Sequence, residues 1–288
     1  MISRKSFYLL LLLTIYYSLF TITALAVEPR FYRYINGPEE GFKSPSGIFV
    51  DREEDEIYVA DNGSGEVYIL ERDGYPLFRF GKLERLRPVD LVVWNDKIFI
   101  VEEGGNSIEI YNYRGEKLGE MTPPDKGFLP GRMALDEGLI YVIAKKKRAV
   151  YIFDPVKGFK RSFPTGLKAM AGIAVSGEKV YVSAPQNVFV IHVFDREGNY
   201  LSRFGRKGLG KEFFTFPGAM TIDEEERLWV IDVFNHRVKV FNEEEKGVFM
   251  VDGHGISFPV DLEVDTDKGL LYILEKGGNR ISVFKIKK

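Results

Sequence analysis

The stretch Pro217-Gly218-Ala219-Met220-Thr221-Ile222-Asp223 occurs in six variants along the chain, and this repetition decides the fold. Successive copies start 40 to 47 residues apart, and the other five read PSGIFVD (45–51), PVDLVVW (88–94), PGRMALD (130–136), MAGIAVS (170–176) and PVDLEVD (259–265). The fourth and sixth places of every heptad are apolar, which is typical of a strand with at least one buried face. Six copies of one unit predict a repeat architecture.

Each heptad is followed by further strand-like segments. The second segments read IYVAD, IFIVE, IYVIA, VYVSA, LWVID and LYILE, and the third read EVYIL, SIEIY, AVYIF, VIHVF, RVKVF and RISVF. Junctions such as Asn62-Gly63 and Gly277-Gly278-Asn279 predict tight turns, because Gly and Asn accept a positive φ at low cost. Segments such as PLFRFG (76–81) and YLSRFG (200–205) predict a fourth strand.

The two ends of the repeat region complement each other. Only four residues follow Phe284, so the last unit has no fourth strand of its own, whereas Phe31 to Ile35 resembles a fourth strand without a preceding heptad. We therefore predict an all-β fold over residues 27–288. It is a six-bladed β-propeller of four-stranded antiparallel blades, whose ring closes when the N-terminal strand pairs with the C-terminal blade. Closure removes exposed sheet edges.

Residues 1–26 differ from the rest of the chain. Arg4 and Lys5 precede a mostly apolar run that ends in Ala24-Leu25-Ala26, which predicts a secretory signal peptide cleaved before Val27. An uncleaved N-terminal anchor is the alternative, since the 20 uncharged residues from Phe7 to Ala26 could span a bilayer. Either reading places the body in the periplasm, on the cell surface or outside the cell.

The composition excludes several classes of site. The chain has no cysteine, so disulfides, thiolate metal sites and a cysteine nucleophile are excluded. Its 288 residues carry a formal net charge of −2, which does not suggest a nucleic-acid partner. About 260 residues after the signal can bury a large core.

The repeat resembles the NHL repeat family. The resemblance rests on the pattern Phe-x-x-Pro-x-Gly-Ile-x-Val-Asp and on the later segments of each unit, and is clearest in residues 42–69 and 214–241. It covers all six units, although Ala144 and Ala184 replace an acidic residue and Met170 replaces a proline. The resemblance implies a propeller, and such propellers include enzymes, ligand-binding sensors and scaffolds.

A propeller offers a site at the mouth of its central channel, where the innermost strands begin. The third heptad place puts Asp90, Arg132 and Asp261 there, and His254 lies in a loop that leads into an innermost strand. Asp90 and Asp261 could bind Ca²⁺ through carboxylate oxygens, and His254 could contribute to a Zn²⁺ site. Alternatively, each aspartate accepts hydrogen bonds from a neighbouring blade, and Arg132 pairs with Asp90. We expect no cofactor, with Ca²⁺ or Zn²⁺ as the alternative.

Two further charged groups lie in the predicted turns between second and third strands. Lys145, Lys146, Lys147 and Arg148 form a basic sector in blade three that could bind an anionic ligand, or could be a solvated loop. Acidic residues at the ends of four second strands could form a rim for a basic ligand, or could accept hydrogen bonds from turn backbone: Asp61, Glu102, Asp232 and Glu275.

These features favour a binding or scaffolding module over an enzyme. We expect an exported propeller that binds a protein or an anionic ligand of the cell envelope through the channel-mouth face. Contact with a membrane would come only through an N-terminal anchor. A metal-dependent hydrolase or lyase acting at the central channel is the alternative. The histidines of NHL-like enzymes that cleave carbinolamides have no matching set here, since the chain holds only His192, His236 and His254.

Overall fold

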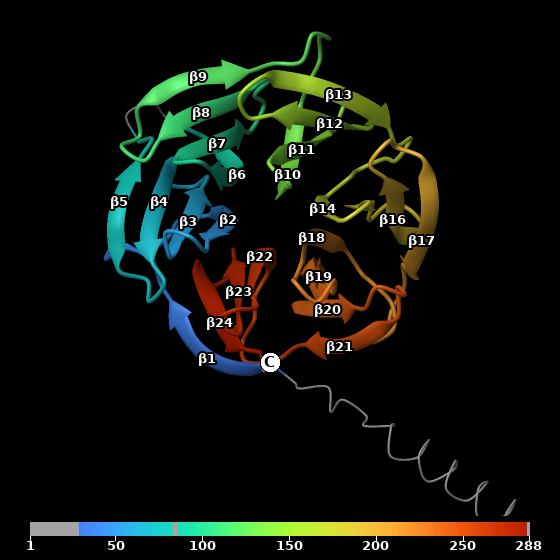
Figure 1. The fold of residues 1–288 in the computed structure, drawn as a ribbon. Helices are drawn as coiled ribbons and strands as arrows, with labels where there is room; N and C mark the ends of the chain where they lie inside the picture. Colours follow the sequence, from blue (N-terminus) through green and yellow to red (C-terminus); the bar gives the residue numbers. More distant parts are fainter. Residues whose placement is uncertain (1–28, 83–85, 287–288) are drawn as a thin grey trace, which may run out of the picture.

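The computed structural model describes residues 29–82 and 86–286. Within these ranges it contains 24 strands and one short 3-10 helix, η1 (Val233–Asn235). The strands form six four-stranded antiparallel sheets, which stand like blades around a central axis (Figure 1). The predicted six-bladed propeller is therefore confirmed. The predicted signal segment, residues 1–26, lies outside the described ranges.

The first three blades follow the chain without interruption, each from its innermost to its outermost strand. Blade one contains β2 (Pro45–Asp51), β3 (Glu56–Asp61), β4 (Glu66–Glu71) and β5 (Pro76–Phe80). Blade two contains β6 (Pro88–Trp94), β7 (Lys97–Glu102), β8 (Ile108–Asn112) and β9 (Lys117–Met121). Blade three contains β10 (Pro130–Asp136), β11 (Leu139–Ala144), β12 (Ala149–Asp154) and β13 (Gly158–Pro164).

Blades four and five repeat this order, and blade six closes the ring. Blade four contains β14 (Gly172–Ser176), β15 (Lys179–Ser183), β16 (Phe189–Asp195) and β17 (Tyr200–Arg206). Blade five contains β18 (Pro217–Ile222), β19 (Leu228–Asp232), β20 (Arg237–Phe241) and β21 (Gly247–Val251). Blade six contains β22 (Pro259–Asp265), β23 (Leu270–Glu275), β24 (Arg280–Lys285) and β1 (Arg30–Ile35).

The N-terminal strand closes the ring as predicted. β1 runs antiparallel to β24, with Phe31 opposite Phe284 and Ile35 opposite Ile281, and the two lie side by side at the outer edge of blade six (Figure 1). Each heptad of the sequence forms the innermost strand of one blade. The innermost strands therefore surround the axis and position any side chain that faces the channel.

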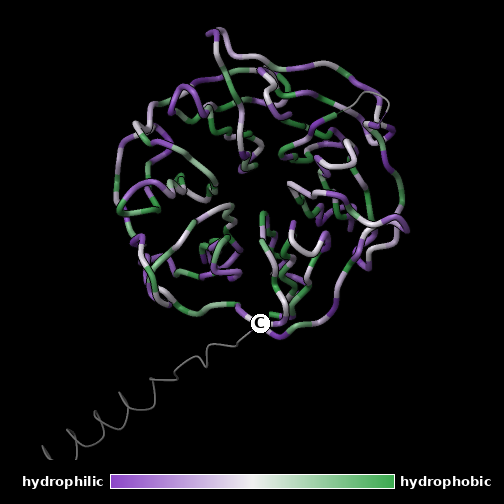
Figure 2. Tube along the Cα trace, turned by 180° about the vertical axis from the view of Figure 1, so that it is seen from behind, coloured by the Kyte–Doolittle hydropathy of each residue, from purple (hydrophilic) through white to green (hydrophobic). Residues whose placement is uncertain are grey.

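The hydrophobic core is divided among the interfaces between neighbouring blades, because each sheet has two faces to bury. In the described chain, each of the six interfaces holds one cluster of buried side chains. The cluster between blades six and one, for example, includes Ile57, Val59, Tyr272 and Leu274. Figure 2 shows hydrophobic residues along the strands within the blades and hydrophilic stretches mainly in the loops.

The two ends of the channel are named here by the direction of the innermost strands. The inlet face is the one at which these strands begin, and the outlet face is the one at which they end. Turns between second and third strands lie on the inlet face, together with the loops that lead into the innermost strands. Over residues 29–82 and 86–286, no helix has the length and hydrophobicity needed to cross a membrane.

Candidate functional site in the central channel

The central channel contains a cavity of about 610 Å³ that is lined by the innermost strands of all six blades. Its lining starts at the level of Asp90, Arg132 and Asp261 and continues to residues that follow the innermost strands, such as Arg52 and Glu224. Glu224 is exposed to solvent. The cavity therefore extends from the third heptad place to the outlet face. It lies on the opposite side of Asp90, Arg132 and Asp261 from the inlet mouth that we expected to carry the site.

Arg132 joins blades three and six across the inlet end of the cavity. Its Nη1 donates to Asp261 Oδ2 at 2.9 Å and to Asp90 Oδ1 at 3.4 Å. Its Nη2 donates to the carbonyl oxygen of Val260 at 2.8 Å. Charge-assisted bonds of this kind fix the planar guanidinium firmly. The three side chains that the sequence placed at the channel are therefore brought together, as one ion-pair cluster.

Both aspartates also accept hydrogen bonds from backbone amides. Asp90 accepts from Met133 N of the next blade at 2.7 Å and from Leu91 N at 3.0 Å. Asp261 accepts from Ile48 N of blade one at 2.9 Å and from Leu262 N at 3.0 Å. The two equivalent Pro-Val-Asp-Leu segments thus use the same device to join consecutive blades. This arrangement matches the structural alternative, in which each aspartate accepts hydrogen bonds from a neighbouring blade.

Burial dominates the electrostatics of this cluster. It raises the pKa of Asp90 to about 7, against the attraction of Arg132, and repulsion by Asp261 adds to the rise. Burial likewise raises the pKa of Asp261, against the same arginine. Each carboxylate costs free energy to ionise inside the protein, and Arg132 compensates part of that cost. The cluster therefore depends on its shared guanidinium.

These residues do not fit a Ca²⁺ or Zn²⁺ ion. Every carboxylate oxygen of Asp90 and Asp261 already accepts a hydrogen bond from an amide or from Arg132, whereas Ca²⁺ takes six or more oxygen ligands. Among the described residues, no group of three or more His, Asp or Glu side chains is arranged to hold a metal. We therefore derive no chemistry through a metal at this position.

His254 does not join the cluster. Its ring stacks on Phe31 at a centroid distance of 5.7 Å and meets the edge of Phe284 at 6.0 Å, which places it beside the outer strands of blade six. The other histidines also lie away from the cavity lining. His192 contacts Asn187 and the carbonyl oxygen of Phe189, and His236 Nδ1 accepts from Phe258 N.

The basic sector forms the turn between β11 and β12 on the inlet face. Lys147 Nζ pairs with Asp125 Oδ2 at 2.9 Å. Lys145, Lys146 and Arg148 form no ion pair with another described residue, and all four side chains belong to exposed residues. The sector is therefore a positively charged surface on the inlet face of blade three, and none of its four residues lines the cavity.

The four acidic residues at the ends of second strands hold the inlet loops. Asp61 accepts from Lys43 N and Ser44 N at 2.6 and 2.8 Å. The other three do the same for their own inlet loops: Glu102 for Arg87 N, Asp232 for Thr215 N and Phe216 N, and Glu275 for Ser257 N. In the described ranges, only Asp61 also accepts from the backbone of its own turn, as the turn alternative predicted, through Gly63 N and Ser64 N. The other three carboxylates hold the inlet loop instead of the turn backbone, so the four do not form a free acidic rim.

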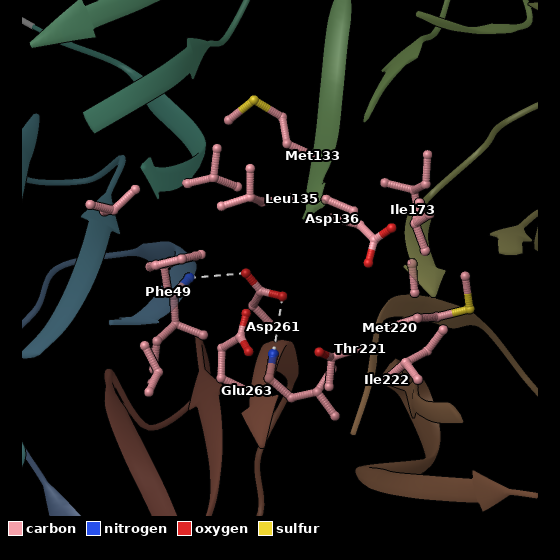
Figure 3. Close-up of a pocket in the computed structure, with 18 of the residues that line it drawn as sticks. Phe49, Met133, Leu135, Asp136, Ile173, Met220, Thr221, Ile222, Asp261 and Glu263 are labelled. Atoms are coloured by element: carbon pink, nitrogen blue, oxygen red, sulfur yellow. Dashed lines mark hydrogen bonds between the residues drawn. The ribbon is translucent and has the colours of Figure 1, made fainter. Parts of the chain in front are cut away.

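Glu263 is the channel residue that sequence reasoning missed. It occupies the fifth place of the last heptad, where the other five copies carry Phe49, Val92, Ala134, Ala174 and Thr221. Comparison of that place across the heptads would have singled it out as the one ionisable residue. Figure 3 shows its carboxylate pointing into the cavity below Asp261, on the same wall.

The Glu263 carboxylate has no hydrogen bond or ion pair with any residue in the described ranges. Burial raises its pKa to about 8, repulsion by Asp261 and Asp90 adds to the rise, and the more distant Arg52 opposes it. Arg52 is engaged elsewhere, because its guanidinium binds Glu224 Oε1 at 2.6 Å and the carbonyl oxygen of Val264 at 2.6 Å. Glu263 is therefore largely protonated at neutral pH.

Apolar side chains of blades three, four and five also line the cavity: Leu135, Ile173, Met220 and Ile222 (Figure 3). Asp136 lies at the outlet end of blade three. Asp136 pairs with Arg196, and Glu226 at the same end accepts from Ser176 Oγ at 2.9 Å. The cavity thus combines an unpaired carboxyl group with a few apolar side chains, in a lining that is otherwise largely polar.

Solved structures share this fold at low sequence identity. A streptogramin B lyase structure matches with a TM-score of 0.68 and 13% identity, over 89% of this chain and 98% of that chain. A gluconolactonase from Xanthomonas campestris matches with a TM-score of 0.68 and 15% identity, over 90% and 95%. A protein of unknown function from Bacteroides thetaiotaomicron matches with a TM-score of 0.68 and 14% identity, over 90% and 73%.

No protein-family model matches the chain, and no curated protein matches it in sequence. Membership of the NHL family therefore stays a prediction. The structural likenesses show that this chain has the six-bladed propeller fold that lyases, lactonases and proteins of unknown function share.

Proposed function

We propose that this protein is a ligand-binding propeller whose central cavity takes up an organic cation from the outlet face. The ligand carries an amine group next to an apolar body. The observation that carries the proposal is Glu263, a carboxyl group inside the cavity that has no protein partner in the described ranges. We also propose that the protein is exported, because the sequence of residues 1–26 has the pattern of a signal peptide.

The charge of the cavity supports a cationic ligand. Its lining includes nine acidic residues and two arginines, and Arg132 is already shared between Asp90 and Asp261. An ammonium group beside Glu263 would favour the ionised carboxylate, because an opposite charge within a few ångströms lowers a carboxyl pKa. Binding at neutral pH therefore expels the proton of Glu263.

The apolar side chains in the cavity lining favour an organic ligand rather than a small inorganic ion. An ammonium group at Glu263 places the rest of the molecule against Leu135, Ile173 and Met220, where burial of hydrocarbon contributes about 25 cal/mol per Å². A volume of about 610 Å³ lies within the range of small-molecule sites. We do not propose a metal-dependent hydrolase or lyase. The carboxylate oxygens of Asp90 and Asp261 already accept hydrogen bonds, and His254 lies outside the cavity lining.

Calorimetry with a matched pair of ligands tests this proposal. Phenethylamine and its neutral analogue 2-phenylethanol differ only in the group that Glu263 would bind. At pH 7 we expect the amine to bind at least tenfold more tightly, which is about 1.4 kcal/mol. Titrations in buffers of different ionisation enthalpy should show release of about one proton.

Two variants make the calorimetric test specific. Glu263→Gln should remove both the preference for the amine and the proton release, whereas Glu243→Gln, at an exposed position outside the cavity lining, should leave both unchanged. Equal binding of the amine and the alcohol by the unaltered protein would overturn the proposal. So would an unchanged preference for the amine in Glu263→Gln.

A further inference from the structure

The turn between second and third strands has the same length in blades one, three, five and six. The residues that flank the turn pair across it at the same spacing: Asp61 with Glu66, Ala144 with Ala149, Asp232 with Arg237, and Glu275 with Arg280. The residue before the third strand has a positive φ in every case: Gly65 72°, Arg148 51°, His236 51° and Asn279 48°. Equivalent backbone groups therefore occupy equivalent positions in the four turns.

In blade one, a carboxylate gathers the amides at this place. Asp61 accepts from Lys43 N and Ser44 N of the inlet loop at 2.6 and 2.8 Å. It also accepts from Gly63 N and Ser64 N of its own turn at 3.0 and 3.3 Å. Four N–H groups thus converge on one carboxylate.

Blade three has a turn of the same length but no carboxylate. Ala144 stands where Asp61 stands in blade one, and a methyl group cannot accept a hydrogen bond. The inlet loop of blade three still contacts the turn after β11, because Lys145 N donates to Leu129 O at 2.9 Å. Val233 N makes the equivalent hydrogen bond to Phe216 O in blade five, also at 2.9 Å. The amides equivalent to those that bind Asp61 belong to Phe128, Leu129, Lys146 and Lys147. None of the four donates to an acceptor in the described ranges.

Lysine side chains lie close to two glycines, one in the blade-three inlet loop and one in β10. A Cβ atom at Gly131 would lie 2.8 Å from Cε of Lys145, and one at Gly127 would lie 3.7 Å from Cε of Lys147. The two lysines therefore extend over the glycines that precede Phe128 and follow Pro130. Lys146 and Arg148 add two more positive charges, and Asp125 neutralises only Lys147 among the four.

We propose that blade three binds a carboxylate group of another molecule at the position that the Asp61 side chain fills in blade one. The amides of Phe128, Leu129, Lys146 and Lys147 are the donors, and Lys145 and Lys147 supply the nearest positive charges. The ligand class is a carboxylate-bearing molecule that approaches the inlet face. This site is independent of the outlet cavity and of the cation proposed there.

Amide chemical shifts of the full chain provide the direct test. Sodium acetate is titrated into the protein at constant ionic strength, with sodium chloride as the balancing salt. We expect the amide signals of Phe128, Leu129, Lys146 and Lys147 to shift in a saturable manner with acetate. Lys43 and Ser44 serve as internal controls, because Asp61 already holds their amides. Equal shifts in the chloride arm, or acetate shifts spread evenly over exposed lysines, would overturn the proposal.

Ala144→Asp supplies the missing carboxylate from within the chain. We expect this variant to lose the response to acetate and to melt at a higher temperature than the unaltered protein, because its own carboxylate holds the amides. Lys157→Gln changes the net charge by the same amount at a turn on the opposite face, and should keep the acetate response. A persistent acetate response in a folded Ala144→Asp variant would contradict the assignment. If this variant does not fold, the acetate titration of the unaltered protein alone tests whether blade three binds a carboxylate.

Discussion

At the scale of single residues, the channel holds Asp90 and Asp261, which have hydrogen-bond partners, and Glu263, whose carboxyl group has none among the described residues. Asp90 and Asp261 are buried, but each accepts two amide hydrogen bonds and shares Arg132. Glu263 lies two residues from Asp261 on the same wall and has no such partners in the described ranges. A carboxyl group that lies in a cavity without hydrogen-bond donors costs free energy to ionise and therefore favours the protonated form. Glu263 is therefore a cost to stability that a binding role would explain.

The raised pKa of Glu263 predicts a pH-dependent gain in stability when the acid is removed. Its pKa is about 8 in the folded protein and 4.5 ordinarily. Between these values the folded protein binds a proton that the unfolded chain has lost, so ionisation of Glu263 lowers stability as pH rises. Glu263→Gln should match the unaltered protein near pH 4 and exceed it by about 4 to 5 kcal/mol at pH 8 to 9.

Urea unfolding at a series of pH values would measure this difference. Glu243→Gln is the control, because Glu243 is exposed, lies outside the cavity lining and forms no hydrogen bond or ion pair with a described residue. A constant difference between Glu263→Gln and the unaltered protein from pH 5 to 9 would show that the carboxyl group ionises normally. It would also weaken the argument for proton release on ligand binding.

At the scale of single elements, a carboxylate at the end of the second strand holds the inlet loop in blades one, two, five and six. Asp61 and Asp232 are fully buried carboxylates that hold these loops by backbone amides. Blade three lacks the carboxylate and carries Lys145 to Arg148 instead. Blade four also lacks it, with Ala184 at the equivalent place. Blade three thus replaces an internal bond with a basic surface that, in our proposal, binds an external carboxylate.

Asp61→Ala should convert the blade-one turn into the type seen in blade three. The substitution removes the acceptor of four amides, and unsatisfied groups of this kind cost about 1 to 3 kcal/mol. We expect the free energy of unfolding in urea to fall by about that amount. Asp73→Ala removes an exposed acceptor of a single amide, from Tyr75, and should change it by no more than about 0.5 kcal/mol. Equal effects of the two substitutions would show that the hydrogen bonds of Asp61 contribute little.

At the scale of the whole molecule, the propeller is a closed ring whose stability includes the contact between its two ends. β1 pairs with β24, and Ile35 packs in the cluster between blades six and one with Phe42 and Ile281. Without β1, the outer edge of β24 would lack its partner, and exposed edges of this kind favour association with other chains.

Ile35→Ala tests ring closure. Ile35 is 3% exposed, and truncation of a buried isoleucine costs about 2 to 5 kcal/mol. We expect a loss of stability in that range, together with increased association in light scattering on mild heating. Tyr32→Ala, on the same strand with a 46% exposed side chain, should cause a much smaller loss. An Ile35→Ala protein as stable as Tyr32→Ala would mean that the ring does not depend on this contact.

The sequence alone determined the propeller, the number of blades and the closure by residues 31–35, because each strand pattern is local and the heptad repeats six times. It also named Asp90, Arg132 and Asp261 as channel residues. Only the tertiary structure decided which charged groups are satisfied, since Arg132 and Asp261 lie 129 residues apart and their partners come from different blades. The position of the cavity and the isolation of Glu263 follow from the packing of six strands about one axis, and no local pattern encodes that arrangement.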